Sequence, residues 1–226
     1  MEFGDSVGIV GFTGFVGSYF AKYIPQAKMF NSRNIHTIRD ESFDTLIMSG
    51  VSAVKWYANK HPSEDLKNIE TLINHMKGVT CKTRFILIST IDVYNSTRLQ
   101  TGDSDENTEC QLEDNNHPYG RHRLKVEHVF REMFPTQFQC FRLPGLFGIG
   151  LKKNIIFDFL KGTLSRLNIH QSFQWYTLEW LIEDIKRHMK FDKERRIINL
   201  FPEPLHNMEL LKIFSEFSDV SDIELV

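Results

Sequence analysis

The sequence has few of the features that mark a secreted, membrane-spanning or nucleic-acid-binding protein. Its 226 residues include only three cysteines, Cys81, Cys110 and Cys140, and none of the nine histidines has ligand spacing. No apolar run approaches the roughly 18 residues of a membrane span. The 27 Lys and Arg do not outnumber the 29 Asp and Glu, so no excess positive charge is available for a phosphate backbone. We therefore expect a cytoplasmic protein that holds no metal and binds neither nucleic acid nor membrane.

The apolar residues that are present fall into a regular alternation. Short runs that fit buried parallel strands lie at residues 7–10, 27–30, 45–48, 85–88 and 138–143. Segments with helical spacing lie between them, at residues 15–24, 66–76 and 126–133. Strands that alternate with helices predict an α/β fold, a Rossmann-like doubly wound parallel sheet. We expect this part to span residues 1–148 and a small C-terminal lobe to span 149–226, packed with it as one unit.

The first strand is followed at once by a glycine-rich segment that opens a helix. A dinucleotide pyrophosphate needs a tight turn, a bare backbone and free amides at a helix N-terminus. Glycines at positions 11, 14 and 17 supply the first two, and the helix start supplies the third. The predicted cofactor-binding residues of this loop are Gly11, Thr13, Gly14, Phe15, Val16 and Gly17. The alternative is a glycine-rich turn with no ligand.

The spacing of these glycines resembles the extended short-chain dehydrogenase/reductase family. Three later segments resemble the same family in the same order. They are Ile-Ser-Thr-Ile-Asp-Val-Tyr-Asn at 88–95, His-Pro-Tyr-Gly-Arg at 117–121 and Phe-Arg-Leu-Pro-Gly-Leu-Phe-Gly at 141–148. The family includes nucleotide-sugar epimerases, dehydratases and ketoreductases. The resemblance therefore implies a nicotinamide cofactor and a nucleotide-sugar substrate.

The resemblance also implies three catalytic residues. Tyr119 matches the phenol that gives or takes a proton, and Thr90 matches the hydroxyl that holds the same substrate oxygen. The family places a lysine four residues after the tyrosine, where this sequence lacks one and has Arg123. Arginine keeps the charge but is larger and planar, so we expect altered or slower turnover. The alternatives are that Tyr119 is a packed aromatic and that Thr90 is a structural hydroxyl.

The absence of acidic residues near the second predicted strand bears on the choice between NADP and NAD. No Asp or Glu occurs between Ser6 and Arg39, where NAD-binding folds place an acid for the ribose hydroxyls. The turn after the second strand instead contains Ser32 and Arg33, which suit the 2′-phosphate of NADP. NAD remains the alternative, with Arg33 a solvated loop charge. Further contacts to the cofactor are expected from Ser49, Gly50, Tyr119, Arg123, Leu143 and Pro144.

The substrate site and the reaction follow from the resemblance. Its expected substrate-binding residues are Val51, Thr90, Asp92, Asn154 and Trp175. Ile91 stands where the family's dehydratases carry an acid, which disfavours dehydration. The short C-terminal lobe and the NADP-like turn favour reduction of a 4-keto-6-deoxy sugar nucleotide. A nucleotide-sugar 4-epimerase is the second candidate, and a cofactor-binding regulatory protein of weak activity is the third.

The resemblance further implies a homodimer. In the family, the helices that correspond to residues 66–76 and 119–133 pair between subunits. Such pairing requires a second apolar stripe on each helix, for which Leu72 and Leu124 are the candidates.

Overall fold

A computed structural model describes residues 3–94, 104–115, 117–191 and 196–226, which form two compact units. Unit 1 comprises Met1–Leu143 and Ile182–Asn199, and unit 2 comprises Pro144–Leu181 and Leu200–Val226. The sequence had suggested a single boundary at residue 148. The chain in fact leaves unit 1 after Leu143 and returns to it for eighteen residues, 182–199.

Unit 1 is built on a six-stranded sheet in the order β10-β5-β4-β3-β1-β2, with every neighbouring pair parallel. The predicted α/β fold with a Rossmann-like parallel sheet is therefore confirmed. The strands are β1 (Val7–Val10), β2 (Lys28–Phe30), β3 (Ser42–Met48), β4 (Thr80–Thr90), β5 (Phe138–Leu143) and β10 (Ile197–Asn199). Residues 197–199 lie in the range expected to form the C-terminal lobe, 149–226, but they form a strand that pairs with β5 at the edge of the main sheet.

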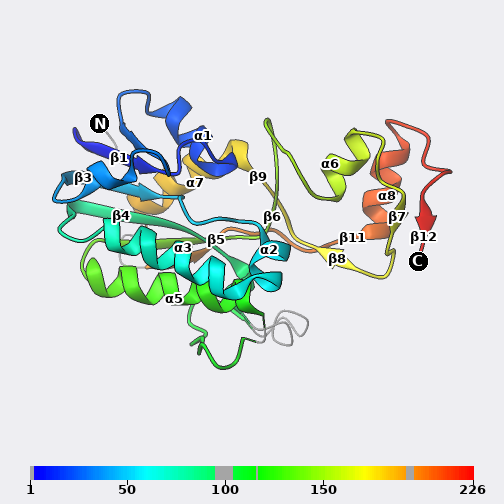
Figure 1. Cartoon of the computed structure of the whole chain (residues 1–226). Coiled ribbons are helices and arrows are strands. Elements are labelled where there is room, and N and C mark those ends of the chain that lie inside the picture. Colours follow the sequence, from blue (N-terminus) through cyan, green and yellow to red (C-terminus); the bar gives the residue numbers. More distant parts are fainter. Residues whose placement is uncertain (1–2, 95–103, 116, 192–195) are drawn as a thin grey trace. The chain divides into compact units, whose positions relative to one another are not determined.

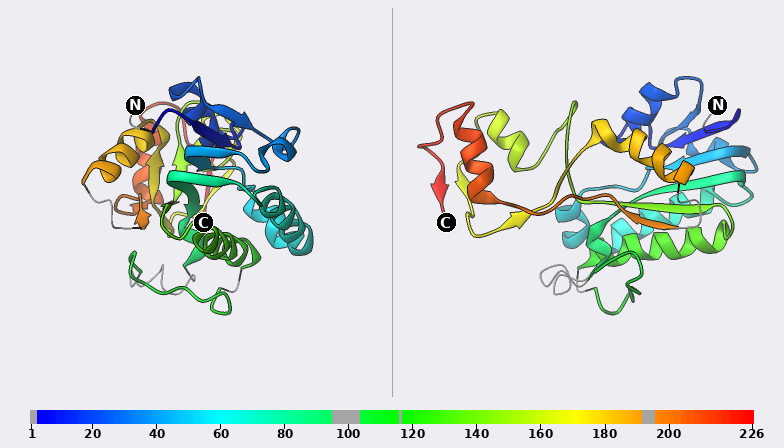
Figure 2. Two further views of the ribbon diagram at one scale, coloured as in Figure 1. Left: turned by 90° about the vertical axis from the view of Figure 1, so that its left-hand side faces the viewer. Right: turned by 180° about the vertical axis from the view of Figure 1, so that it is seen from behind.

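Helices cover both faces of this sheet (Figures 1 and 2). On one face α3 lies beside α5, and Lys125 of α5 pairs with Glu70 of α3 at 2.9 Å. On the other face, Lys186 of α7 donates to the Tyr23 hydroxyl of α1 at 3.0 Å. The helical elements are α1 (Phe15–Tyr23), η1 (Ile35–Ile38), α2 (Lys55–Lys60), α3 (Pro62–His75), η2 (Ile91–Val93), α5 (Pro118–Met133) and α7 (Leu178–Phe191).

The core of unit 1 explains why the apolar runs became strands. Ile9, Leu46, Ile47 and Phe85 are fully buried in the centre of the sheet. Strands that helices cover on both sides need apolar residues at successive positions rather than at alternate ones.

The order of the strands creates a topological switch point at the carboxyl ends of β1 and β3. After β1 the chain turns to β2 on one side, and after β2 it crosses to β3 on the other side of β1. Ligands of open α/β sheets bind at such a switch point, outside the carboxyl ends of the strands. The predicted glycine loop follows β1, and the segment that begins at Ser49 follows β3. The topology thus places two predicted cofactor segments at the switch point.

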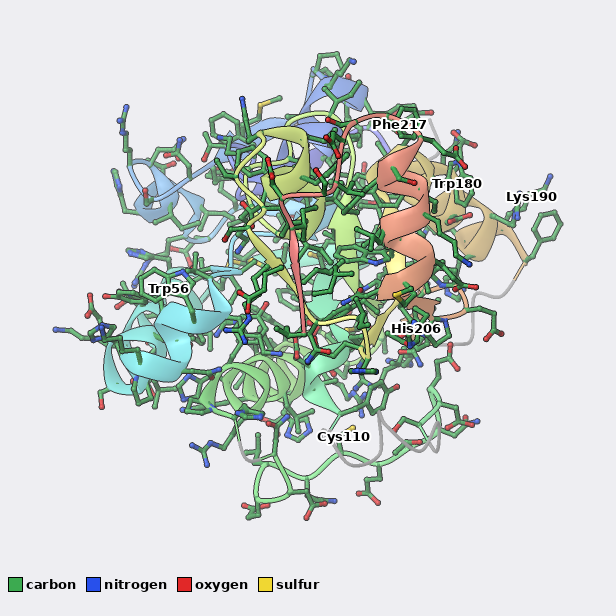
Figure 3. All side chains as sticks on the ribbon, turned by 90° about the vertical axis from the view of Figure 1, so that its right-hand side faces the viewer. Trp56, Cys110, Trp180, Lys190, His206 and Phe217 are labelled. Atoms are coloured by element: carbon green, nitrogen blue, oxygen red, sulfur yellow. The ribbon has the colours of Figure 1, made fainter. Side chains whose placement is uncertain are left out.

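Unit 2 consists of short elements. Its strand pairs are β6 with β9, β11 with β8 and β12 with β7. The rings of Phe159 and Phe214 stack between α6 and α8 with their centroids 3.9 Å apart. Figure 3 shows Phe217, which is exposed just beyond α8, and His206, which caps this helix. The elements are β6 (Gly145–Phe147), α6 (Ile155–Leu160), β7 (Arg166–Leu167), β8 (Ser172–Phe173), β9 (Trp175–Thr177), β11 (Leu205–His206), α8 (Asn207–Ser215) and β12 (Glu224–Leu225).

Two further expectations concern the surface of the chain. Within the described ranges, no helix is both long and apolar enough to cross a bilayer. Leu124, a candidate for the dimer stripe, is only 1% exposed and packs against Val93 and Tyr94 inside unit 1. Leu72 is half-buried against the core beneath α3. The homodimer stays a prediction, and Leu124 is not available to its interface.

Candidate functional site

The glycine loop forms a tight turn between β1 and α1. Gly11 has a φ of +87°, and its amide donates to the Phe30 carbonyl at 2.8 Å. A Cβ at Gly11 would lie 2.5 Å from the Ser49 carbonyl oxygen, and one at Gly17 would lie 2.1 Å from the Gly11 carbonyl oxygen. Both glycines are therefore required by the protein's own packing.

Gly14 differs from the other two glycines of the loop. Its φ is −78°, a value that any residue adopts, and an added Cβ would meet only the Gly11 carbonyl oxygen, at 3.2 Å. Gly14 is exposed and forms the N-cap of α1 without a side-chain hydrogen bond to the helix amides. Thr13 is exposed beside it, and Phe15 and Val16 are half-buried. A bare backbone at an uncapped helix start is the arrangement that a pyrophosphate requires.

The segment after β3 lies against this loop. The Ser49 hydroxyl donates to the Val10 carbonyl at 2.8 Å, which ties the end of β3 to the end of β1. A Cβ at Gly50 would lie 2.8 Å from the Val10 side chain, so close approach of the two strands explains this glycine. Val51 follows and packs against the core. The predicted cofactor residues Ser49 and Gly50 are thus beside the glycine loop.

The turn after β2 is ordered by its asparagines. The Asn34 side chain accepts from the Asn31 amide at 2.7 Å and donates to the Met29 carbonyl at 2.9 Å. Asn31 in turn accepts from the Arg33 amide at 2.9 Å. Ser32 and Arg33 are both exposed on this turn. Because β2 is parallel to β1 and adjacent to it, the turn after β2 and the glycine loop after β1 both lie at the carboxyl end of the sheet.

Tyr119 and Thr90 meet at the carboxyl end of β4. Tyr119 is in the first turn of α5, where its amide donates to the Asn59 side chain at 3.0 Å. A Cβ at Gly120 would lie 2.0 Å from the Asp92 carbonyl oxygen, so only glycine lets α5 start against the turn that follows Thr90. The Thr90 side chain is close enough to the Tyr119 phenol to lower the pKa of that phenol. The structure therefore brings together the two residues expected to act on one substrate oxygen.

The surroundings of Tyr119 favour its protonated form. Burial raises its pKa to about 12, against the opposing effects of Arg123 and of the hydrogen bond with Thr90. The Asp92 and Asp65 carboxylates also raise this pKa. The phenol is therefore protonated at neutral pH.

Arg123 is held by other protein groups. Its guanidinium donates to both carboxylate oxygens of Asp65, at 2.5 and 3.2 Å, and to the Ser52 carbonyl. Its Cζ lies 4.3 Å from the centroid of the Tyr119 ring. Arg123 is only 4% exposed. The structure thus places the expected cation against Tyr119, but pairs it with a carboxylate that sequence reasoning had not considered.

Both carboxylate oxygens of Asp92 have a partner. One carboxylate oxygen pairs with Lys55 Nζ at 2.5 Å, and the other accepts from the Thr90 hydroxyl at 3.1 Å. Lys55 begins α2, whose Trp56 is exposed (Figure 3). The pair connects α2 to the Thr90 turn, so Lys55 is a site residue that the sequence motifs did not reveal.

A buried ion pair fixes the ends of β4 and β5. Arg142 of β5 donates to both oxygens of Glu127 on α5, at 3.1 and 2.6 Å. Glu127 also accepts from the Ser89 hydroxyl at 2.5 Å. Burial alone would lower the pKa of Arg142, but Glu127 raises it above its ordinary value. The network holds Ser89, and with it the neighbouring Thr90, against α5.

The remaining predicted residues are divided between the units. Leu143 ends β5 in unit 1 and is buried, whereas Pro144 begins unit 2. Asn154 caps α6 by accepting from the Phe157 amide at 3.1 Å and donates to the Leu146 carbonyl at 2.8 Å. Trp175 starts β9 and is half-buried against Gly145. Asn154 and Trp175 belong to unit 2, so their roles toward a substrate stay predictions.

Comparisons with known proteins identify the fold. No protein-family model matches the chain, and no curated protein matches its sequence. Among solved structures, an NAD-dependent NDP-hexosamine 5,6-dehydratase involved in tunicamycin biosynthesis is similar with a TM-score of 0.78 at 12% identity, over 98% of this chain and 84% of that one. RMD from Pseudomonas aeruginosa complexed with NADPH has a TM-score of 0.76 at 17% identity, over 98% and 85%.

A third similar structure is a dTDP-4-dehydrorhamnose reductase from Clostridium acetobutylicum, with a TM-score of 0.72 at 14% identity, over 98% of this chain and 83% of that one. The structures cover nearly the whole of this chain, and the identities are low. They establish that the chain has the fold of the extended short-chain dehydrogenase/reductases, as its motifs predicted.

Proposed function

We propose that this chain is an NAD(P)-dependent reductase of nucleotide sugars that reduces a 4-keto-6-deoxy sugar to the alcohol. The observation that carries the proposal is the contact of Tyr119 with Thr90 at the carboxyl end of β4. The glycine loop lies at the carboxyl end of the same parallel sheet. Its Gly14 has a backbone conformation that any residue could adopt, so the fold itself does not require glycine there. Similar structures include a dTDP-4-dehydrorhamnose reductase and an NADPH complex, which support this substrate and cofactor class.

In this reaction the protein supplies the proton and the orientation. Tyr119 donates its phenolic proton to the sugar carbonyl oxygen, and Thr90 hydrogen-bonds the same oxygen. A bound nicotinamide dinucleotide would supply the hydride to the carbonyl carbon, so that the alcohol and the oxidised cofactor are the products. The loop at Gly14 and the α1 N-terminus would hold the pyrophosphate, with Ser49 and Gly50 beside it. Val51, Asp92, Asn154 and Trp175 are the proposed substrate contacts.

NADP is the proposed cofactor, with NAD as the alternative. The exposed Arg33 and Ser32 support a 2′-phosphate site, because a guanidinium binds phosphate oxygens in a fixed geometry. The described residues form no hydrogen bond or ion pair with the Arg33 guanidinium.

Two other functions use the same fold. A 4-epimerase is the second candidate, and epimerases are among the similar structures. That reaction begins by removing a proton from a sugar hydroxyl, for which the protonated state of Tyr119 is less suited. A regulatory cofactor-binding protein is the third candidate, and Arg123 in place of lysine supports it. Dehydration is disfavoured, because Ile91 has no proton to give and Asp92 is paired with Lys55.

We also propose a cytoplasmic homodimer. Among the described residues, Cys81, Cys110 and Cys140 form no disulfide, which supports a reducing compartment. The dimer has weaker support, because only Leu72 of its two candidate residues is partly exposed.

The test follows NADPH absorbance with a 4-keto-6-deoxy sugar nucleotide in the purified protein and in Tyr119→Phe. A positioned proton donor contributes about 10²–10⁴-fold in rate, so kcat should fall by that order while cofactor affinity stays nearly unchanged.

Thr90→Val should lower kcat by less, since it removes one hydrogen bond and leaves the proton source. Arg123→Lys should keep or raise activity if arginine is a tolerated substitute.

The other outcomes separate the candidates. NADPH consumption that is as fast in Tyr119→Phe as in the native chain would contradict the mechanism. Interconversion of a 4-hydroxyl epimer pair without net oxidation would favour the epimerase. Tight cofactor binding with neither activity would favour the regulatory protein.

A further inference from the structure

A cluster of three charged or titratable side chains lies buried between α3 and α5, and two of them, Asp65 and His122, are outside the residues that the motifs assign. Asp65 of α3 accepts from Arg123 at 2.5 and 3.2 Å and contacts His122 Nδ1 at 2.8 Å. All three residues are at most 6% exposed. Burial alone would raise the pKa of Asp65, but its hydrogen bonds with Arg123 and His122 hold this pKa below its ordinary value. Asp65 is therefore ionised.

The cluster determines where the Arg123 guanidinium lies. Asp65 takes both of its terminal nitrogens, the Ser52 carbonyl accepts a further bond, and the Tyr119 ring lies against its Cζ at 4.3 Å. Turning the guanidinium toward another partner would leave Asp65 as a buried carboxylate with His122 alone. Such uncompensated burial is costly, so the guanidinium is fixed against the phenol.

The charges that face Tyr119 come from three elements. Arg123 on α5 is positive, Asp65 on α3 is negative, and Asp92 on η2 is negative and paired with Lys55 of α2. The positive charge of Arg123 is therefore matched by Asp65 at hydrogen-bond distance. A cation stabilises a nearby phenolate only to the extent that no anion offsets it.

We propose that Asp65 is a positioning residue that fixes Arg123 against Tyr119 and offsets part of its charge, so that the Tyr119 phenol keeps its proton to higher pH. This proposal rests on the proposed function and specifies its direction. A protonated phenol can give its proton to a carbonyl oxygen in a reduction. It cannot start an oxidation by accepting a proton, which a 4-epimerase needs as its first step. Asp65 thereby adapts the site to reduction.

The experiment titrates the ultraviolet absorbance of tyrosinate, with Tyr119→Phe subtracted to isolate Tyr119. Asp65→Asn leaves the charge of Arg123 without its partner, so the ionisation constant of Tyr119 should rise severalfold, up to about tenfold. The double variant Asp65→Asn with Arg123→Gln removes both charges and should bring the ionisation constant back down to or below that of the native chain, because Arg123 acts on Tyr119 more strongly than Asp65 does. Asp65→Glu keeps the charge and should return the titration close to that of the native chain.

A matched control uses the same helix. Glu70→Gln removes an exposed carboxylate of α3 that pairs with Lys125, and it should leave the Tyr119 titration unchanged. Equal Tyr119 titrations in Asp65→Asn and the native chain would overturn the proposal. If Asp65→Asn alone fails to fold, the comparison moves to Arg123→Gln against the double variant. The double variant lacks the unpaired charge of Asp65, so its Tyr119 should have a larger ionisation constant than that of Arg123→Gln. Equal ionisation constants in these two variants would overturn the proposal.

These titrations need neither cofactor nor substrate. They can therefore support the role of Asp65 even if the chain consumes no NADPH, a result that would count against the proposed function alone. Conversely, reductase activity with an unmoved titration would count against Asp65 alone. In an active chain, the pH profile of kcat/KM should lose activity at lower pH in Asp65→Asn than in the native chain, because the donor form is lost earlier.

Discussion

At the scale of single residues, the partners of a side chain decide what its charge can do. Arg123 is buried, paired with Asp65 and stacked on Tyr119, so its charge acts locally. Arg33 is exposed on an ordered turn at the carboxyl end of β2. Of these two arginines, Arg33 is therefore the one suited to receive a phosphate from solvent.

This difference predicts a cofactor effect at Arg33. Arg33→Ala should weaken NADPH binding by about 1.5–3 kcal/mol, because a charge-assisted phosphate contact is lost. NADH binding should not change, since it has no 2′-phosphate. Fluorescence titration of both cofactors measures the effect. Lys22→Ala, which removes an exposed cation at the far end of α1, is the control and should change neither affinity. Equal native affinities for NADPH and NADH would contradict the assignment.

The sequence predicted the site residues that motifs mark and missed those that tertiary contacts supply. Tyr119, Thr90 and Arg123 stand at recognisable spacings along one strand end and one helix. Asp65 reaches Arg123 from 58 positions earlier, and no local pattern relates an acid on α3 to an arginine on α5. Lys55 was missed for the same reason, because its pairing with Asp92 depends on how α2 packs.

At the scale of elements, strands were predicted well and short segments poorly. The run 138–143 holds four apolar residues, with Gln139 and Arg142 among them, and β5 has these same bounds with all six residues buried. The six-residue α2 carries too little periodicity to be recognised. The strand at 197–199 was assigned to the C-terminal lobe rather than to the main sheet, because its partner β5 lies far away in the sequence. Local pattern thus gives the element, whereas pairing requires the whole chain.

The glycine loop permits a prediction with a matched pair of variants. Gly17→Ala should destabilise the protein by about 1–3 kcal/mol, because its Cβ would lie 2.1 Å from a backbone oxygen. Gly14→Ala should leave stability nearly unchanged, because its Cβ would meet only the Gly11 carbonyl oxygen, at 3.2 Å. It should weaken NADPH binding about tenfold or more, because a pyrophosphate needs a bare backbone at this point of the loop. Thermal unfolding and cofactor titration measure the two effects. Normal NADPH affinity in Gly14→Ala would remove the loop from the cofactor site.

At the scale of the whole molecule, the candidate functions differ in how many ligands stabilise the fold. All three candidates bind a dinucleotide, since the switch point and the glycine loop serve each of them. Only the two enzymes also bind a nucleotide sugar. A ligand that binds the native state alone stabilises it by mass action, independently of any turnover. Ligand-dependent stability therefore separates an enzyme from a regulatory protein, even where the activity is too slow to detect.

The prediction is an additive shift in the unfolding temperature. NADPH at 100 times its Kd should stabilise the native state by about 2.7 kcal/mol, or about 5–11 °C for a chain of this length. A nucleotide sugar added to the saturated complex should raise the temperature again, and Tyr119→Phe should keep both shifts because it alters the proton and not the binding surface. Gly14→Ala, the control, should lose the NADPH shift. If the cofactor shift occurs but no nucleotide sugar adds to it, the regulatory candidate is favoured over both enzymes. If neither NADPH nor NADH gives a shift at saturating concentration, then the glycine loop binds no dinucleotide and all three candidates fail together.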